Sequence, residues 1–263
     1  MKLGLALPSF VEDPDIPIAV ARAAEAAGLD GVFVYDHVWR DIPPPRRPAL
    51  ECFSLLGAVA AETTTISVGT LVARATLRPA ATLAAAFETV HRVSGGRLIA
   101  AIGAGDSQSR AENEAFGLPF GTIEDRCEAL AHAAQAASGR GFPVWIGGHA
   151  RHVLDVVALA DGWNGWGGTP ADYARFGRRV LDVAPDVMLT WGGLICLDAD
   201  DDAARTKATA RNASPNVLVG GPARLAAQLA AYGAAGAQWA VVAPLDASNA
   251  ANAHRLGEVA GRL

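Results

Sequence analysis

The chain has 263 residues, of which 51% are apolar and 19% are charged, and its formal net charge is −5. The apolar fraction excludes a disordered chain, which could not bury enough surface to offset its ordering entropy. No apolar run reaches about 20 residues, which excludes a membrane-spanning segment. The acidic balance argues against a nucleic-acid partner. The length admits one large α/β barrel or two ordinary domains.

Cysteine usage and the N-terminal residues predict a cytoplasmic protein. Cys52, Cys127 and Cys196 stand far apart with no CxxC pair, which is typical of core thiols in a reducing compartment. The first residues, MKLGLALPSF, lack the long apolar stretch and cleavage site of a signal peptide, and they predict a first strand instead.

Short β-rich runs alternate with helical stretches along the whole chain, which is the pattern of βα units. The predicted strands span residues 3–7, 32–35, 66–71, 98–103, 144–147, 162–166, 187–197 and 239–243. The predicted helices span residues 16–27, 51–62, 79–93, 123–137, 151–160, 171–183, 200–211 and 247–260, with a further helix at 222–235. We therefore expect eight strands, each with a helix after it.

Eight such units favour a single (β/α)8 barrel domain over residues 1–263. The alternative, a doubly wound open sheet, usually has fewer strands and carries a glycine-rich fingerprint after strand one. Leu7-Pro8-Ser9-Phe10 occupies that place instead. The proline-rich stretch 42–48 comes too early to separate two domains, so we expect it to form a long loop on the barrel mouth.

Glycines cluster after the predicted strands four, five and six, at the end of a barrel where active sites lie. They are Gly103, Gly105, Gly147, Gly148, Gly167 and Gly168. Glycine permits close backbone approach to a ligand, and consecutive N–H groups near a helix start suit a phosphate. Alternatively, these glycines only make tight turns between strand and helix, and the residues alone leave both interpretations open.

Asp36 and His37 follow the second predicted strand. An unperturbed histidine titrates near pH 6.5, so His37 can move a proton at neutral pH. The alternative is a loop-capping aspartate beside a surface histidine. No HExxH metal motif, GxSxG elbow or Walker A loop occurs in the sequence, which argues against those three chemistries.

Several segments, in this order, resemble the bacterial luciferase-like monooxygenase family. They are Asp36-His37, Gly69-Thr70-Leu71-Val72 through Arg78-Pro79, Ser94-Gly95-Gly96-Arg97-Leu98, Gly103-Ala104-Gly105-Asp106, Glu114-Ala115-Phe116-Gly117-Leu118-Pro119, Pro143-Val144-Trp145-Ile146-Gly147-Gly148 and Ala160-Asp161-Gly162-Trp163. The Asp-His pair and the Gly-Ala-Gly-Asp segment are most similar to the branch that uses the deazaflavin coenzyme F420. Branches that use flavin mononucleotide (FMN) share much of this framework, so FMN is the alternative cofactor.

The resemblance implies a cofactor ring across the barrel mouth, supported by a non-prolyl cis peptide that would be Leu71–Val72 here. It places Gly147 and Gly148 at the phosphate-bearing tail, with His149 or Arg151 as helpers. The cofactor-binding residues that it implies are Asp36, Thr70, Leu71, Val72, Gly103, Ala104, Gly105, Gly147, Gly148, Trp166 and Gly167.

The resemblance also implies hydride transfer at C5 of the deazaflavin, with a small organic substrate and a homodimeric enzyme. The cofactor carries the difficult step, and the protein aligns the reactants and manages a proton. His37 would take that proton and Asp106 would assist near the ring, although the family's best-known sugar-phosphate enzyme has a glutamate there.

This sequence departs from the family pattern at one point that bears on the substrate. Relatives usually carry an insertion between the fourth helix and the fifth strand, whereas residues 138–142 here run almost directly into that strand. The substrate therefore does not transfer from the family.

Three alternatives to an F420-dependent oxidoreductase remain. They are an FMN-dependent monooxygenase, a non-catalytic flavin-binding barrel, and a phosphate-metabolising barrel isomerase or aldolase. The last fits the glycines but lacks a well-placed Schiff-base lysine, since Lys2 and Lys207 are the chain's two lysines.

Overall fold

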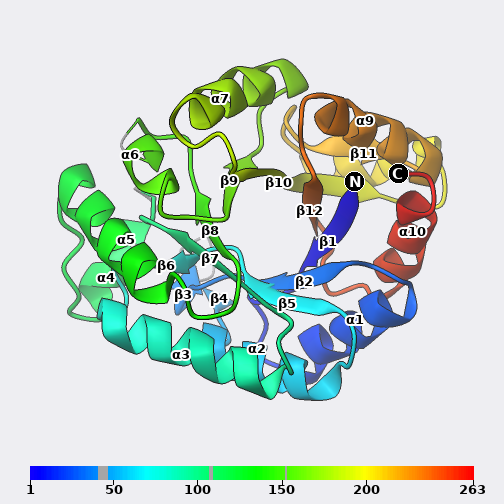
Figure 1. The fold of residues 1–263 in the computed structure, drawn as a ribbon. Helices are drawn as coiled ribbons and strands as arrows, with labels where there is room; N and C mark the ends of the chain where they lie inside the picture. Colours follow the sequence, from blue (N-terminus) through cyan, green and yellow to red (C-terminus); the bar gives the residue numbers. More distant parts are fainter. Residues whose placement is uncertain (41–46, 107–108, 152) are drawn as a thin grey trace.

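Eight parallel strands close into a barrel at the centre of the computed structural model, which describes residues 1–40, 47–106, 109–151 and 153–263 (Figure 1). In order around the barrel, the strands are β1 (Lys2–Ala6), β2 (Gly31–Val34), β5 (Ser67–Thr70), β7 (Leu98–Gly103), β8 (Val144–Gly147), β9 (Gly162–Trp166), β10 (Met188–Leu197) and β12 (Trp239–Pro244). Pairing of β12 with β1 closes the ring. The predicted (β/α)8 barrel is confirmed, and the open-sheet alternative is wrong.

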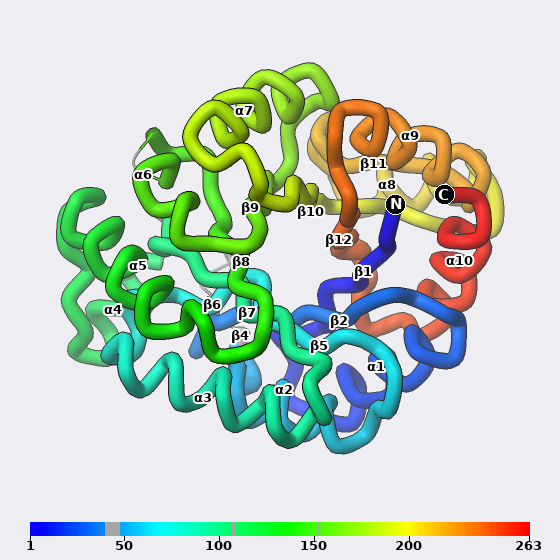
Figure 2. The backbone as a smooth tube through the Cα atoms, in the orientation of Figure 1, coloured from blue at the N-terminus to red at the C-terminus, as the bar shows by residue number. Residues whose placement is uncertain are grey.

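Helices form a ring outside the strands (Figure 1). They are α1 (Asp15–Ala26), α2 (Cys52–Glu62), α3 (Ala80–Val93), α5 (Ile123–Ala137), α6 (Val153–Val157), α7 (Pro170–Val183), α8 (Asp201–Ala210), α9 (Pro222–Ala234) and α10 (Ala251–Ala260). The backbone tube shows the two ends of the chain near one another (Figure 2). In the described part of the chain, no helix is long and apolar enough to cross a membrane.

Several small elements were not predicted because each is too short to display a hydrophobic period. They are the antiparallel pair β3 (Trp39–Arg40) and β4 (Arg47–Pro48), the strands β6 (Ala73–Arg74) and β11 (Leu218–Gly220), and the helix α4 (Arg110–Ala115). Helices α6 and α10 are also shorter than the predicted 151–160 and 247–260. Of the loop expected at 42–48, residues 42–46 lie outside the described residues.

Aromatic rings fill the barrel interior, and glycines on neighbouring strands make room for them. Phe33, Trp145 and Trp239 are at most 4% exposed, with ring centroids 5.6–6.1 Å apart. A Cβ on Gly69 would lie 2.9 Å from the Phe33 ring, and one on Gly162 would lie 2.4 Å from Cδ1 of Trp145. Large rings therefore fit because glycine lines the opposing positions.

A second apolar layer separates the barrel from the helices. Strand residues alternate between the two layers, so that Phe33 packs inside the barrel while Val32 and Val34 pack against the helices. The three cysteines are buried and free of disulfides, as predicted. Helix α5 ends at Ala137 and β8 begins at Val144, so the connection is as short as the sequence indicated.

Replacing Gly162 by alanine should destabilise the fold by about 1–3 kcal/mol, because the added methyl group would overlap the Trp145 indole. Gly57 provides the matched control. It lies inside α2 with no atom near its missing Cβ, so Gly57→Ala should stabilise the protein by about 0.5–1 kcal/mol through helix propensity. Urea unfolding of both variants tests the pair, and equal effects would contradict the packing argument.

Candidate active site

The barrel mouth, where the strands end, has one half lined by glycine. Gly103 ends β7 and Gly147 ends β8. A Cβ on either would meet the Val72 side chain, at 2.5 Å and 2.7 Å respectively. Val72 therefore lies over both strand ends and, being half-buried, presents an apolar platform to the mouth.

The platform follows an irregular segment between β5 and β6. The Leu71–Val72 peptide is cis, as the family resemblance implied. Just before it, the Thr70 hydroxyl donates to the carbonyl of Ala101 at 2.6 Å, which ties this segment to β7. Thr70 itself is fully buried, so its side chain supports the segment from within the protein.

His37 lies beside the mouth and is fixed by a carboxylate from α4. Its Nδ1 lies 2.9 Å from Oε2 of Glu112, whose side chain is 3% exposed. Because a carboxylate only accepts hydrogen bonds, Nδ1 carries the hydrogen. Nε2 is then the nitrogen that can exchange a proton with a ligand, and the His37 side chain retains 24% exposure.

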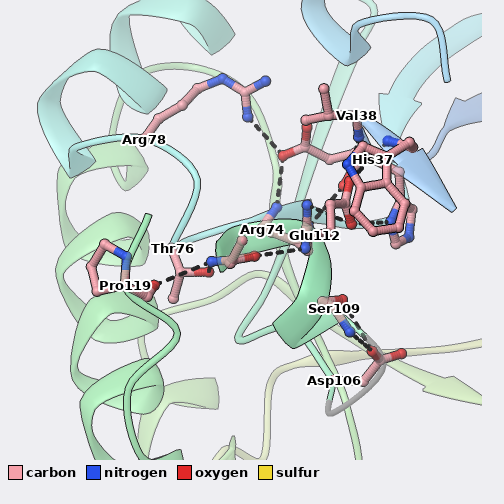
Figure 3. A network of polar contacts seen from close by, with 12 residues as sticks. His37, Val38, Arg74, Thr76, Arg78, Asp106, Ser109, Glu112 and Pro119 are labelled. Atoms are coloured by element: carbon pink, nitrogen blue, oxygen red, sulfur yellow. Dashed lines mark hydrogen bonds and ion pairs between the residues drawn. The ribbon is translucent and has the colours of Figure 1, made fainter. Parts of the chain in front are cut away.

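Glu112 gathers further donors around the same carboxylate (Figure 3). The backbone N–H groups of Val38 and Trp39 donate to Oε1, and Arg74 Nη2 forms an ion pair with Oε2 at 3.0 Å. Burial alone would raise the pKa of Glu112, but the hydrogen bonds and the Arg74 charge lower it below its usual value. The site therefore holds this carboxylate in its ionised form.

Asp36 lies behind His37 in the same network. Its carboxylate accepts from Nη1 of Arg78 at 2.7 Å and from the Arg74 backbone N–H at 2.9 Å. With a side chain 1% exposed, Asp36 fixes the loop that carries His37 and has no surface toward the mouth. Arg78 continues to Glu51, so each buried charge in this region has a partner.

Asp106, the other predicted catalytic residue, is exposed and bound locally. Its Oδ1 accepts from the backbone N–H and the hydroxyl of Ser109, each at 3.0 Å. In Figure 3 this pair lies apart from the dashed contacts around Glu112. Asp106 thus binds Ser109, the residue directly before α4, the helix that carries Glu112.

The ends of β8 and β9 form a glycine-rich rim. Gly148, Gly167 and Gly168 all adopt positive φ, which favours glycine. The Trp166 N–H donates to Nε2 of His149 at 2.9 Å, and burial lowers the pKa of His149. His149 thus ties the ends of β8 and β9 together.

Lys207 has no role as a Schiff-base nucleophile in this arrangement. Its Nζ lies 3.0 Å from Asp198, 2.9 Å from Asp246 and 2.8 Å from the Leu197 carbonyl. Burial alone would lower the pKa of Lys207, but the two carboxylates raise it and keep the amine protonated. Lys2, the other lysine, lies over Trp239 at the opposite end of the barrel. A Schiff-base aldolase would thus have no unpaired lysine at the mouth to act through.

Sequence reasoning missed the residues that hold His37. Glu112 and Asn113 sit on the short helix α4, and Asn113 accepts from Nη1 of Arg74 at 3.0 Å. The one available signal was the Arg74-to-Arg78 segment, where two arginines enter an otherwise apolar stretch. No group of three or more His, Cys, Asp or Glu suited to a metal occurs among the described residues.

Comparisons with known proteins agree with this geometry. A family model described as luciferase-like monooxygenase matches residues 1–138. The 5,10-methylenetetrahydromethanopterin reductase of Methanolobus tindarius is 24% identical over 240 residues, which cover 80% of this chain and 70% of the relative. The F420-dependent glucose-6-phosphate dehydrogenase of Beutenbergia cavernae is 37% identical over 112 residues, or 41% of this chain and 32% of the relative.

A solved structure shares the fold over nearly the whole chain. It is an F420-dependent secondary alcohol dehydrogenase in complex with an F420-acetone adduct, with a TM-score of 0.80 and 14% identity. The match covers 98% of this chain and 97% of that one.

Replacing Glu112 by glutamine should destabilise the protein at pH 7 by about 3 kcal/mol, because it leaves the buried Arg74 charge unpaired. The pKa of Glu112 is lowered in the folded state, so its contribution is complete above the ordinary value of 4.5. The contribution is lost as the pH falls through the folded-state pKa. Urea unfolding at pH 7 and pH 4 should show the gap between the two proteins shrinking in acid.

Glu114→Gln is the matched control, since this residue is 60% exposed on the same helix. It should leave stability within about 0.5 kcal/mol of the parent at both pH values. A Glu112→Gln protein as stable as the Glu114→Gln control would remove the ion pair from the account.

Proposed function

Since the chain belongs to the luciferase-like monooxygenase family, we propose that it is an F420-dependent oxidoreductase. It would transfer a hydride between the deazaflavin and a small organic substrate. The observation that carries this proposal is the His37–Glu112 pair beside the glycine-lined half of the mouth. Relatives named as F420-dependent enzymes support the choice of cofactor.

The residues at the mouth fit a planar cofactor. Gly103 and Gly147 have no side chain to rise above the Val72 platform, so a flat ring can rest on it. The residues on the ring side would be Thr70, Leu71, Val72, Gly103, Ala104 and Gly105, with Asp106 at the edge. On the tail side, Gly147, Gly148 and Gly167, with the backbone of Trp166, would lie along the phosphate-bearing tail at the glycine-rich rim.

The chain's own part in the reaction is to position the substrate and move one proton. When bound, the oxidised deazaflavin would accept the hydride from a substrate carbon. As the C–H bond breaks, Nε2 of His37 would take the hydroxyl proton and a carbonyl would form. Glu112 would stabilise the resulting imidazolium through Nδ1, and in the reverse direction His37 would donate the same proton.

Titration with F420 and with FMN tests the cofactor. F420 fluorescence should change on binding with a defined dissociation constant, whereas FMN should bind more weakly. Tight FMN binding without F420 binding would favour the monooxygenase alternative. F420 binding without turnover of alcohols, carbonyl compounds or sugar phosphates would favour a non-catalytic barrel.

His37→Ala should lower turnover by about 10²–10⁴-fold, because the reaction loses its proton acceptor. F420 affinity should stay the same, since the variant leaves the Val72 platform and the glycine-rich rim intact. His132→Ala, on the exposed side of α5, is the control and should keep full activity. Undiminished turnover in His37→Ala would remove His37 from the mechanism.

We also propose a homodimer, on the family resemblance, and a cytoplasmic location, on the free cysteines. Light scattering coupled to gel filtration measures the assembly directly. Cell fractionation measures the location.

A further inference from the structure

The part of the mouth where β9 and β10 end carries two exposed apolar side chains. Trp166, the last residue of β9, is 37% exposed, and Leu194 on β10 is 39% exposed. On β9, Trp163 packs against the helices, so alternation turns Trp166 inward. On β10, Trp191 stacks on Tyr232 of α9, so Leu194 also faces the barrel axis.

The two side chains form one surface. A Cβ on Gly192, which pairs with Trp166 across the sheet, would lie 2.6 Å from the Trp166 indole. The indole therefore covers Gly192, and Leu194 is the next inward residue along β10. Together they present an aromatic face and an aliphatic face to the same space.

Aromatic contacts connect this surface to the proposed proton carrier. The Tyr35 ring meets the Trp166 indole edge-on at 6.4 Å, and Phe10 stacks on Tyr35 at 6.0 Å. Phe10 then contacts the His37 ring at 5.4 Å. A ligand that lies on Trp166 and Leu194 is thus held by the same wall that ends at His37.

Three cations near this part of the mouth are already paired. Arg74 and Arg78 are bound to Glu112 and Asp36, and Lys207 is bound to two aspartates. None of these three cations is available to a phosphate. Other exposed apolar side chains, such as Val93 and Val183, lie at helix ends and need no ligand to account for them.

We propose that the substrate carries a flat apolar ring, which packs on Trp166 and Leu194 while its hydroxyl or carbonyl group meets His37. Trp166 and Leu194 are then the residues that determine specificity. The assignment rests on the proposed oxidoreductase function for the chemistry at His37. The ring-binding surface itself can be measured without turnover.

The test is a saturation-transfer NMR titration of the F420-loaded protein with 1-phenylethanol, 2-propanol and glucose 6-phosphate. The phenyl ring should tighten binding by about tenfold or more over 2-propanol, because it buries apolar area. Trp166→Ser and Leu194→Ser should each weaken 1-phenylethanol binding by about fivefold or more. Val183→Ser, at a still more exposed position at the end of α7, should leave it unchanged.

Two results would overturn the assignment. One is tighter binding of glucose 6-phosphate than of 1-phenylethanol, and the other is unchanged binding in both serine variants. F420 affinity is measured on the same samples, and Leu194→Ser should leave it unaltered. If F420 does not bind at all, the proposed function fails, and the same titration of the unloaded protein still decides whether Trp166 and Leu194 bind the ring.

Discussion

The buried carboxylate of Glu112 is the interaction on which the proposed site depends. It joins three pieces of chain: α4, which carries it, the segment after β2 with His37, and β6 with Arg74. A buried charge is tolerated only when it is paired and hydrogen-bonded. The Glu112 carboxylate meets that requirement only when all three pieces are in place. The contacts that allow Glu112 to be buried are therefore the same contacts that orient His37.

Glycine serves two different purposes along the barrel. Deep in the interior, Gly69 and Gly162 give space to large rings, so the barrel is solidly packed below the mouth. At the mouth, Gly103 and Gly147 give space to Val72, which stays half-buried. Glycine thus permits dense packing in the barrel interior, and at the mouth it leaves room for the proposed ligand platform at Val72. Which of the two it does depends on its position along the strand.

The fold was predictable because hydrophobic residues in the eight strands and in most helices recur with the period of their secondary structure. The cis Leu71–Val72 peptide came from resemblance alone and is confirmed. Glu112 was not predictable, because its partner His37 lies 75 residues away and α4 spans only six residues. No local pattern marks a pair that only the closed barrel brings together, and the same holds for Asp36 with Arg78.

The mouth is divided into parts with few shared contacts. The ion network uses β6, α4 and the segment after β2, whereas Trp166 and Leu194 stand on β9 and β10. The two parts meet through the rings of Phe10 and Tyr35. Substitutions at sites without shared partners are usually additive in free energy. Substitutions at Trp166 or Leu194 can therefore change which ring is bound while His37 keeps its hydrogen bond to Glu112. The range of ligands and the transfer of the proton can thus vary independently.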